Sequence, residues 1–207
     1  IYPTLTYPIH TTLVTGVSPE THGIIHNQKA SLTPDEPDFS LMGSDWYWEK
    51  KNIKVPTLAD AVFADGRTVA SVNWPVTGGE KRGVNCPEIW PVKSLCEDPR
   101  EVYKNSASES VFDRYYDRYI AHYNWKNNND LLTYGGEIAI DLIENEKPDL
   151  MLYHAVHLDH IRHVYGDLAP ETVDCLKTLD ILVERIFEAS KRAGTFDETN
   201  FVILGDH

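Results

Sequence analysis

The sequence YPTLTYPIHTTLVTGVSPETHGIIHN, residues 2–27, combines several hydroxyl side chains with the start and the end of a predicted helix. Pro8 suits the first turn of a helix, where its missing N–H costs nothing, while Tyr7 before it favours extended backbone. Gly16 can adopt the left-handed conformation that ends a helix. Thr6 is therefore predicted to lie just ahead of a helix N-terminus, where backbone N–H groups and the helix dipole favour a phosphate. Taken alone, the segment favours a plainer interpretation, in which its threonines only cap the helix or pack against neighbouring residues.

The composition predicts one globular domain, with 207 residues, 42% hydrophobic and 25% charged. The formal net charge of −13 argues against general nucleic-acid binding and against docking on anionic lipid. It allows a phosphate substrate if bound cations reverse the local charge. The sequence has no apolar run of about 18 residues, so no membrane span is predicted.

The chain begins at Ile1 without an initiator Met and stops at His207 directly after an apolar stretch, which we interpret as a piece of a longer protein. It contains no N-x-[ST] glycosylation acceptor, which slightly favours a cytoplasmic over an extracytoplasmic location. The sequence contains no C-x-x-C pair, so it does not predict a zinc site built from cysteines. Cys86 and Cys96 are compatible with one disulfide or with free thiols. The oligomeric state stays open.

Helical and strand patterns alternate over much of the chain, which predicts an α/β fold with a mostly parallel sheet flanked by helices. The expected strands are residues 68–73, 149–155 and 200–204, the last two buried, and the expected helices include residues 57–65, 108–123, 131–146 and 170–192. The helix at 170–192 has an apolar face that includes Val173, Leu176 and Leu182. Residues 76–130 lack the αβ alternation, and we expect them to leave the sheet as an insertion, a lid or a wall of a site.

Polar side chains follow both predicted buried strands, at the edge where α/β sheets bind ligands. Asp159 and His163 are four residues apart, so on a helical turn they share a face and can chelate one metal ion. Asp206 and His207 follow the second strand directly. Each pair is a weak signal alone. It is much less expected by chance that both pairs follow predicted strands while Thr6 lies at a helix start.

With these pieces in hand, the chain resembles the nucleotide pyrophosphatase/phosphodiesterase family of the alkaline phosphatase superfamily. The matching motifs are T-x-T-[YF]-P-x-H at residues 4–10, T-L-V-T-G at 12–16, P-E-x-H-G-I at 19–24 with Asn27, V-P-T-L-A-D at 55–60, L-D-x-x-x-H-x-Y-G at 158–166, and the terminal D-H. The family usually has Asn where this chain has Ile9. The resemblance covers both ends well and residues 76–130 poorly.

The resemblance implies that residues 1–207 are one incomplete catalytic domain with an alkaline-phosphatase-like sheet. Thr6 would be the nucleophile that forms a covalent phospho-enzyme, and Asn27 would donate a hydrogen bond to a phosphate oxygen. The implied substrate is a small-molecule phosphate ester with nucleotide character. Trp74 is a candidate for stacking on a base or another flat group, although an aromatic residue at a strand end is more often part of the core.

The resemblance also implies two divalent metal ions, and zinc is the metal that we expect first. Asp159 and His163 would bind one ion, while Asp206 and His207 would bind the other, which also holds Thr6. Two more ligands are implied outside the chain, an Asp before Ile1 and a His beyond His207.

Other interpretations remain open. A phosphomonoesterase, a phosphonate hydrolase or a phosphate-transferring mutase of the same superfamily would share the metal-binding residues. An inactive metal-binding fragment is the alternative from another class. A sulfatase is disfavoured, because no cysteine lies in the C/S-x-P-x-R setting those enzymes use.

Overall fold

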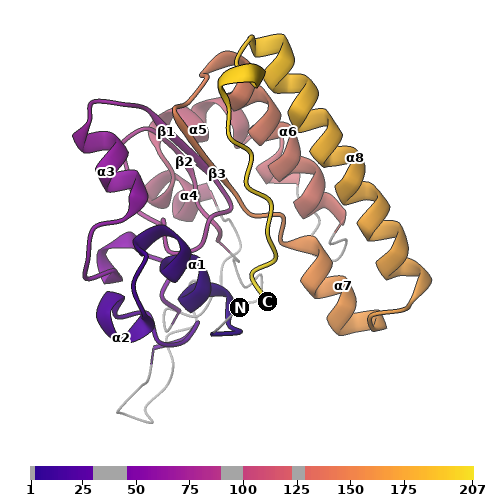
Figure 1. The fold of residues 1–207 in the computed structure, drawn as a ribbon, viewed down its shortest axis with the longest axis horizontal. Coiled ribbons are helices and arrows are strands. Elements are labelled where there is room, and N and C mark those ends of the chain that lie inside the picture. The colour runs from indigo at the N-terminus through magenta and orange to yellow at the C-terminus, as the bar shows by residue number, and fades with distance from the viewer. Residues whose placement is uncertain (1–2, 30–45, 90–99, 123–128) are drawn as a thin grey trace.

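A parallel three-stranded sheet lies at the centre of the described part of the chain (Figure 1). The computed structural model describes residues 3–29, 46–89, 100–122 and 129–207. The strands are β1 (Val69–Val72), β2 (Val84–Cys86) and β3 (Leu150–Tyr153), in the order β2-β1-β3. Ala70 pairs with Val84 on one side and with Met151 on the other, both in parallel. All three carboxyl ends therefore meet at one edge of the sheet.

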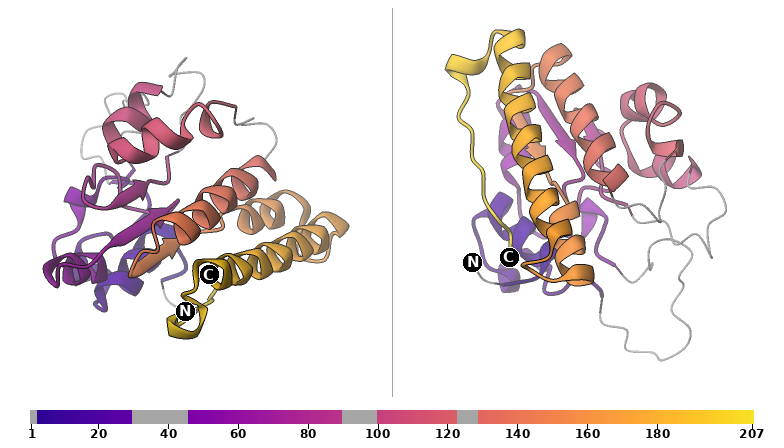
Figure 2. Two further views of the ribbon diagram at one scale, coloured as in Figure 1. Left: turned by 90° about the horizontal axis from the view of Figure 1, so that it is seen from above. Right: turned by 90° about the vertical axis from the view of Figure 1, so that its right-hand side faces the viewer.

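Helices cover both faces of this sheet (Figures 1 and 2). The helices of the described residues are α1 (Thr6–Thr15), α2 (Pro19–His22), α3 (Leu58–Ala64), α4 (Arg100–Ser106), α5 (Glu109–Tyr115), α6 (Asn129–Asn145), α7 (His157–Tyr165) and α8 (Pro170–Ala193), with 3-10 turns at Lys50–Asn52, Ile120–His122 and Phe196–Glu198. No helix among the described residues is both long and apolar enough to cross a membrane.

The alternation of side chains along β1 assigns the helices to the two faces. Ala70 and Val72 belong to the main core, which also contains Ile138 and Leu142 of α6 and residues of α4 and α5. Val69 and Ser71 point the other way and line a pocket with Phe63 of α3. The sheet is thus a layer between α4–α6 and the pair α1 and α3.

The expected helix at the start of the chain is confirmed, and Gly16 ends it in the left-handed conformation with φ 69°. The helix begins at Thr6 itself, so Thr6 occupies the first helical position instead of preceding it. The helix capped by Thr57 is also confirmed. Its capping box pairs the Thr57 hydroxyl with the Asp60 N–H and the Asp60 carboxylate with the Thr57 N–H.

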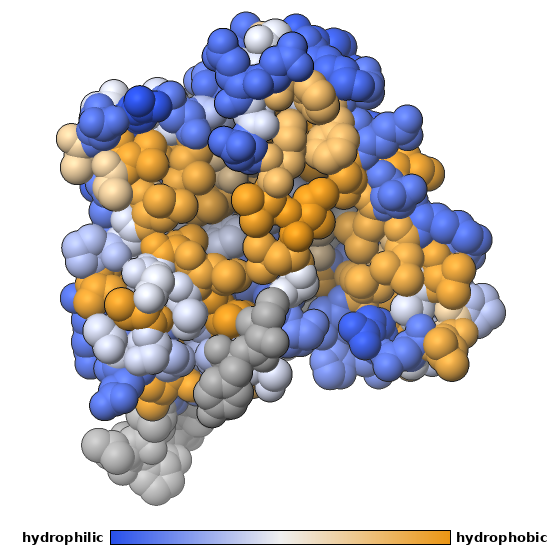
Figure 3. All heavy atoms as spheres, viewed as in Figure 1, coloured by the Kyte–Doolittle hydropathy of each residue, from blue (hydrophilic) through white to orange (hydrophobic). Residues whose placement is uncertain are grey.

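The prediction of a buried strand at residues 200–204 is wrong. This segment runs as irregular chain past the sheet towards α1 (Figure 1), and Val202 and Ile203 are 79% and 68% exposed. A strand forms only where neighbouring backbone supplies hydrogen-bond partners, and within the described residues this segment joins no ladder. The strand at 149–155 is confirmed as β3, but its residues are half-buried instead of buried. Apolar side chains consequently gather on this face of the molecule (Figure 3).

The long helix at 170–192 is confirmed as α8, but its predicted apolar face is only partly buried. Leu182 is buried against α6, whereas Val173 and Leu176 are 43% and 49% exposed. The first half of α8 extends with α7 beyond the end of the sheet (Figure 1). Periodicity therefore predicted the helix correctly and its buried surface incorrectly.

The expectation that residues 76–130 leave the sheet is wrong for β2, whose three residues pair with β1. The following helices α4 and α5 contribute Tyr103, Val111 and Tyr115 to the main core. Cys86 in β2 is a buried free thiol, and Cys96, its alternative disulfide partner, lies outside the described residues. Part of this section is therefore structural core, and a lid function for the remainder stays a prediction.

Truncation of Ile120 tests whether this section folds with the sheet. Ile120 is 2% exposed in the main core, so Ile120→Ala is expected to lower the free energy of unfolding by about 2–5 kcal/mol. Urea denaturation followed by circular dichroism measures the change. Ile181→Ala, on an exposed position of α8 (57%), is the control and should change stability by less than about 0.5 kcal/mol. Equal effects of both variants would show that the section is not part of the cooperative core.

Candidate functional site

The carboxyl edge of the sheet, the N-terminus of α1 and the end of the chain come together in one place (Figures 1 and 2). His154 continues β3 by one residue, and its backbone N–H donates to the Val72 oxygen at 3.1 Å. Helix α7 begins at His157, three residues later. Thr6 opens α1 on the other side, and Asp206 and His207 lie between the two helices.

Thr6 contacts one of the predicted metal-binding pairs. Its hydroxyl Oγ1 lies 3.3 Å from Nε2 of His207. The same Nε2 is 3.6 Å from a carboxylate oxygen of Asp206. Residues 200–204 do not form a strand, but the chain after them still brings Asp206 and His207 to Thr6 at the start of α1.

The other predicted pair lies next to the first. Asp159 and His163 share one face of α7, with Oδ1 and Nε2 3.3 Å apart, and both side chains are exposed. Nδ1 of His207 is 3.9 Å from Oδ1 of Asp159. The structure therefore brings Thr6 and both carboxylate–histidine pairs into one continuous cluster.

Asn27 returns to the same helix start through the turn after α2. Its Oδ1 accepts a hydrogen bond from the Tyr7 N–H at 2.9 Å. This contact uses the acceptor end of the amide, so the NH₂ group is the end left for a ligand. An amide donor beside Thr6 suits an anionic oxygen.

Three residues of this site were not predicted as functional from the sequence: His10, Glu88 and His154. His10 lies one turn after Thr6 and its Nδ1 is 2.8 Å from the Thr6 carbonyl oxygen. Glu88 follows β2 and accepts a hydrogen bond from Nδ1 of His154 at 2.9 Å. Glu88 and His154 carry the same signal as the other pairs, a polar residue just after a strand, whereas His10 lies inside α1 and has no such signal. For Glu88 this signal was hidden, because β2 itself was not predicted.

Burial and neighbouring charge move the pKa values of these two histidines in opposite directions. Burial, and next the nearby His154, lower the pKa of His10 to about 4. For His154, burial also opposes the charged form, but the hydrogen bond and charge of Glu88, helped by Asp206, outweigh it and raise the pKa. One imidazole of the pair is thus held neutral, and the other is stabilised in its charged form.

The donor atoms fit a metal ion in pairs. Two ligands of one tetrahedral zinc ion, with bonds of about 2.0–2.2 Å, lie roughly 3.3 Å apart. Asp159 and His163 meet this spacing at 3.3 Å, and Asp206 and His207 approach it at 3.6 Å. Each pair supplies two ligands, fewer than a complete zinc site contains.

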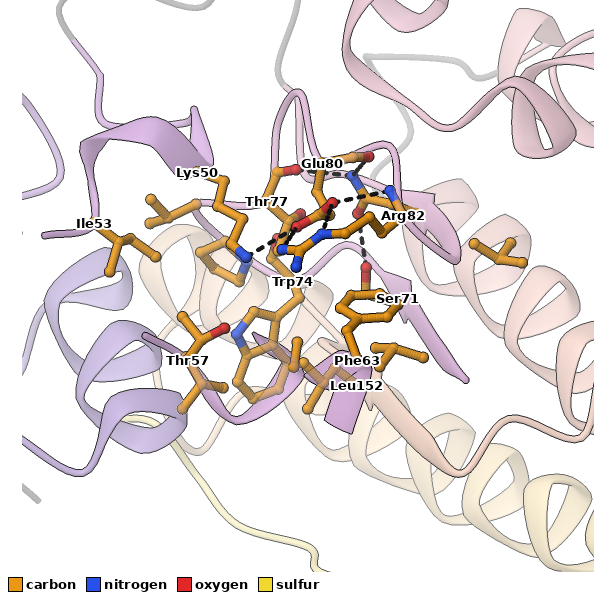
Figure 4. Close-up of a pocket in the computed structure, with 17 residues that line it drawn as sticks. Lys50, Ile53, Thr57, Phe63, Ser71, Trp74, Thr77, Glu80, Arg82 and Leu152 are labelled. Carbon is orange, nitrogen blue, oxygen red and sulfur yellow. Dashed lines mark hydrogen bonds and ion pairs between the residues drawn. The ribbon is translucent and has the colours of Figure 1, made fainter. Parts of the chain in front are cut away.

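Trp74 lines a pocket between α3 and the sheet (Figure 4). Its indole packs edge-to-face on His10, with ring centroids 4.8 Å apart, and lies beside Thr57 and Leu152 in the pocket. Trp74 therefore packs behind the site. Stacking of Trp74 on a substrate stays a prediction.

A charged network closes the rim of that pocket (Figure 4). Lys50 Nζ and Arg82 Nη2 each contact both Glu80 and Asp60, at 2.5–2.9 Å. Burial opposes the charge of Glu80, but the hydrogen bonds from Arg82 and Lys50 outweigh it and lower the pKa of Glu80 to about 2. The network ties α3 to the turn before β2.

The lowered pKa of Glu80 predicts a pH-dependent contribution to stability. A carboxylate whose folded pKa lies below its unfolded value of about 4.3 stabilises the fold above that value. This contribution is lost as the pH falls from about 4.3 towards 2. Glu80→Gln should therefore lower the free energy of unfolding by about 1–3 kcal/mol at pH 7, and the difference from wild type should shrink below pH 4.3.

Urea denaturation at a series of pH values between 7 and 3.5 measures this difference. Glu184→Gln, at an exposed position of α8, is the matched control and should change little at any pH. A difference between wild type and Glu80→Gln that stays constant across the series would contradict the assignment.

Comparison with solved structures identifies the fold. The chain aligns with an inactive variant of murine ectonucleotide pyrophosphatase/phosphodiesterase 5 in complex with AMP, at 18% identity and a TM-score of 0.56, covering 95% of this chain and 43% of that one. It also aligns with phosphonoacetate hydrolase from Sinorhizobium meliloti in complex with phosphonoformate, at 17% identity and a TM-score of 0.58, covering 90% and 43%. The chain therefore has an α/β fold of the alkaline phosphatase kind.

The whole chain, residues 1–207, matches the family described as type I phosphodiesterase / nucleotide pyrophosphatase, and it belongs to that family. Similar curated proteins include a pyrophosphatase/phosphodiesterase of Schizosaccharomyces pombe (23% identical), family member 3 of the ectonucleotide pyrophosphatase/phosphodiesterases of Bos taurus (25%) and venom phosphodiesterase of Macrovipera lebetinus (26%). Each alignment covers all of this chain but only 36%, 20% and 20% of the relative.

Proposed function

We propose that the protein containing this chain hydrolyses phosphodiester or pyrophosphate bonds of nucleotide-like substrates through a covalent phosphothreonine at Thr6. The observation that carries the proposal is the convergence of Thr6 with two carboxylate–histidine pairs at the carboxyl edge of the sheet. Membership of the phosphodiesterase family supports the reaction class. The AMP bound to the murine relative supports a nucleotide-like substrate.

Thr6 suits the role of nucleophile by position. It is the first residue of α1, so a phosphoryl group at its hydroxyl meets the free N–H groups and the positive end of the helix dipole. In the proposed reaction Oγ1 attacks phosphorus, and the bond to the leaving oxygen breaks on the opposite side. Water then cleaves the phosphothreonine and restores the hydroxyl.

Two divalent metal ions, with zinc preferred by the mixed nitrogen and oxygen donors, complete the proposal. Such ions lower the pKa of a bound hydroxyl and stabilise attacking and leaving oxygens in an in-line displacement. Asp159 and His163 would hold one ion. Asp206 and His207 would hold the ion nearest to Thr6, whose hydroxyl already lies within 3.3 Å of His207.

Asn27 has a separate role in the proposal. Its side-chain oxygen is occupied by the Tyr7 N–H, which directs the neutral NH₂ group towards a non-bridging phosphate oxygen. Such a donor stabilises the negative charge that develops there without exchanging a proton. Its contribution adds to that of the helix N-terminus.

Substitution of Thr6 tests the mechanism. In the full-length protein, Thr6→Ala should lower kcat for bis(p-nitrophenyl) phosphate by about 10³-fold or more, because the attacking oxygen is gone. Thr6→Ser should retain measurable turnover and form a phosphoenzyme that mass spectrometry detects at residue 6. Thr4→Ala, the same change at an exposed position, is the control and should leave kcat unchanged. Wild-type turnover by Thr6→Ala would refute the mechanism.

Substrate and metal preference separate the proposal from its alternatives. The enzyme should cleave the diester in preference to p-nitrophenyl phosphate and phosphonoacetate, lose activity with a chelator, and recover it with Zn²⁺. Preference for the monoester or the phosphonate would instead support those activities. A purified full-length protein that binds zinc but cleaves none of the three would support an inactive metal-binding domain.

A further inference from the structure

Glu88 and His154 form a buried pair that belongs to neither of the carboxylate–histidine pairs already described. Nδ1 of His154 and Oε2 of Glu88 are 2.9 Å apart, and the two side chains are only 12% and 5% exposed. Glu88 comes from the segment after β2 and His154 from the end of β3. The pair thus bridges two strands at the edge where the site lies.

The Glu88 carboxylate fixes how the His154 ring presents its other nitrogen. A carboxylate only accepts hydrogen bonds, so Nδ1 of His154 must carry the proton between them. With Nδ1 held in this way, Nε2 faces Asp206 and lies 4.0 Å from its Oδ2. In metal sites the ligating histidines and carboxylates are usually held in turn by outer polar groups, and His154 backed by Glu88 is such a group for Asp206.

Asp206 needs such support more than a residue on a helix or strand would. It lies in the irregular segment at the end of the chain, where no backbone ladder among the described residues fixes it. Its Oδ2 is surrounded by imidazole nitrogens of His10 at 3.6 Å, His207 at 3.6 Å and His154 at 4.0 Å. Of these rings, His154 is the one anchored by a buried carboxylate.

We propose that Glu88 is a positioning residue, which acts through His154 to hold Asp206 in the orientation that binds the metal ion beside Thr6. This inference rests on the proposed function, because it assumes that Asp206 is a metal ligand. Glu88 itself contacts neither the metal nor the substrate. Its effect is to orient a carboxylate that lies in an irregular part of the chain.

A separate metal site made of His10, His154 and Asp206 is the competing interpretation. One possible ligand atom from each of these residues lies within 4.8 Å of the others. However, Nδ1 of His10, the atom nearest Asp206, is 2.8 Å from the Thr6 carbonyl oxygen and therefore carries a proton. A protonated ring nitrogen cannot bind a metal ion, so His10 could join such a site only through Nε2 and not through the nitrogen that faces Asp206.

Zinc affinity of the full-length protein, measured by competition with a chromophoric chelator, tests the inference. Glu88→Gln keeps the size of the side chain and removes its charge, and it should weaken zinc binding about 10- to 100-fold. Glu80→Gln is the matched control, because Glu80 is also largely buried and ion-paired (13% exposed) but lies in the network around Lys50. It should lower stability while leaving zinc affinity unchanged.

A double-mutant cycle tests whether Glu88 acts through His154. If it does, Glu88→Gln combined with His154→Asn should bind zinc no more weakly than His154→Asn alone. Additive losses, or wild-type affinity of Glu88→Gln, would overturn the inference. If Glu88→Gln does not fold, Glu88→Asp, which keeps the charge but withdraws it by one methylene, should show the same loss of affinity.

Asp206→Asn separates failure of this inference from failure of the proposed function. Loss of zinc affinity in Asp206→Asn, but not in Glu88→Gln, would refute only the positioning role. Unchanged affinity in Asp206→Asn would refute the metal assignment and this inference with it. A third zinc equivalent in wild type that His10→Asn abolishes would favour the separate metal site and overturn the inference.

Discussion

The parallel pairing of β1 with β3 is the interaction on which the candidate site depends. It aligns Val72 with Tyr153 and extends to the hydrogen bond from the His154 N–H to the Val72 oxygen. That register sets where β3 stops, and therefore where α7 begins and where Asp159 and His163 lie. Because β2 pairs with β1 in the same direction, Glu88 reaches the same edge. A shift of one residue in β3 would turn His154 to the opposite face and break its contact with Glu88.

Part of the candidate site could be predicted from the sequence, because local signals mark the helices that carry Thr6 and the pair Asp159 and His163. Pro8 and Gly16 delimit the helix that begins at Thr6, and a spacing of four residues places Asp159 and His163 on one face of α7. Each signal depends only on neighbours in the chain. The rule that the carboxyl ends of parallel strands share an edge holds for Asp159 and His163, which follow β3, whereas Asp206 and His207 reach that edge on irregular chain.

The elements that escaped prediction are those whose stability comes from distant parts of the chain. β2 has only three residues, and its central one is polar. Asn85 is buried there because Ser71 donates to its Oδ1 while its NH₂ group donates to the Thr77 and Glu80 oxygens. No local pattern shows such partners. Residues 200–204 illustrate the reverse, since their apolar, β-branched sequence favours a strand, but within the described residues no neighbouring backbone pairs with them.

Electrostatics gives an independent reason to expect cations at this edge of the sheet. Asp159, Asp206 and Glu88 bring three carboxylates to the site, and the 207-residue chain carries a formal charge of −13. The raised pKa of His154 favours a charged imidazole that offsets only part of that charge, while burial lowers the pKa of His10 and favours its neutral form. A phosphate ester approaching Thr6 would meet net negative charge with only the helix N-terminus in its favour, an effect of about 1 kcal/mol. Divalent cations bound by the carboxylate–histidine pairs would reverse the sign of the local charge, so the same residues that repel the substrate in the bare protein would attract it in the metal-bound one.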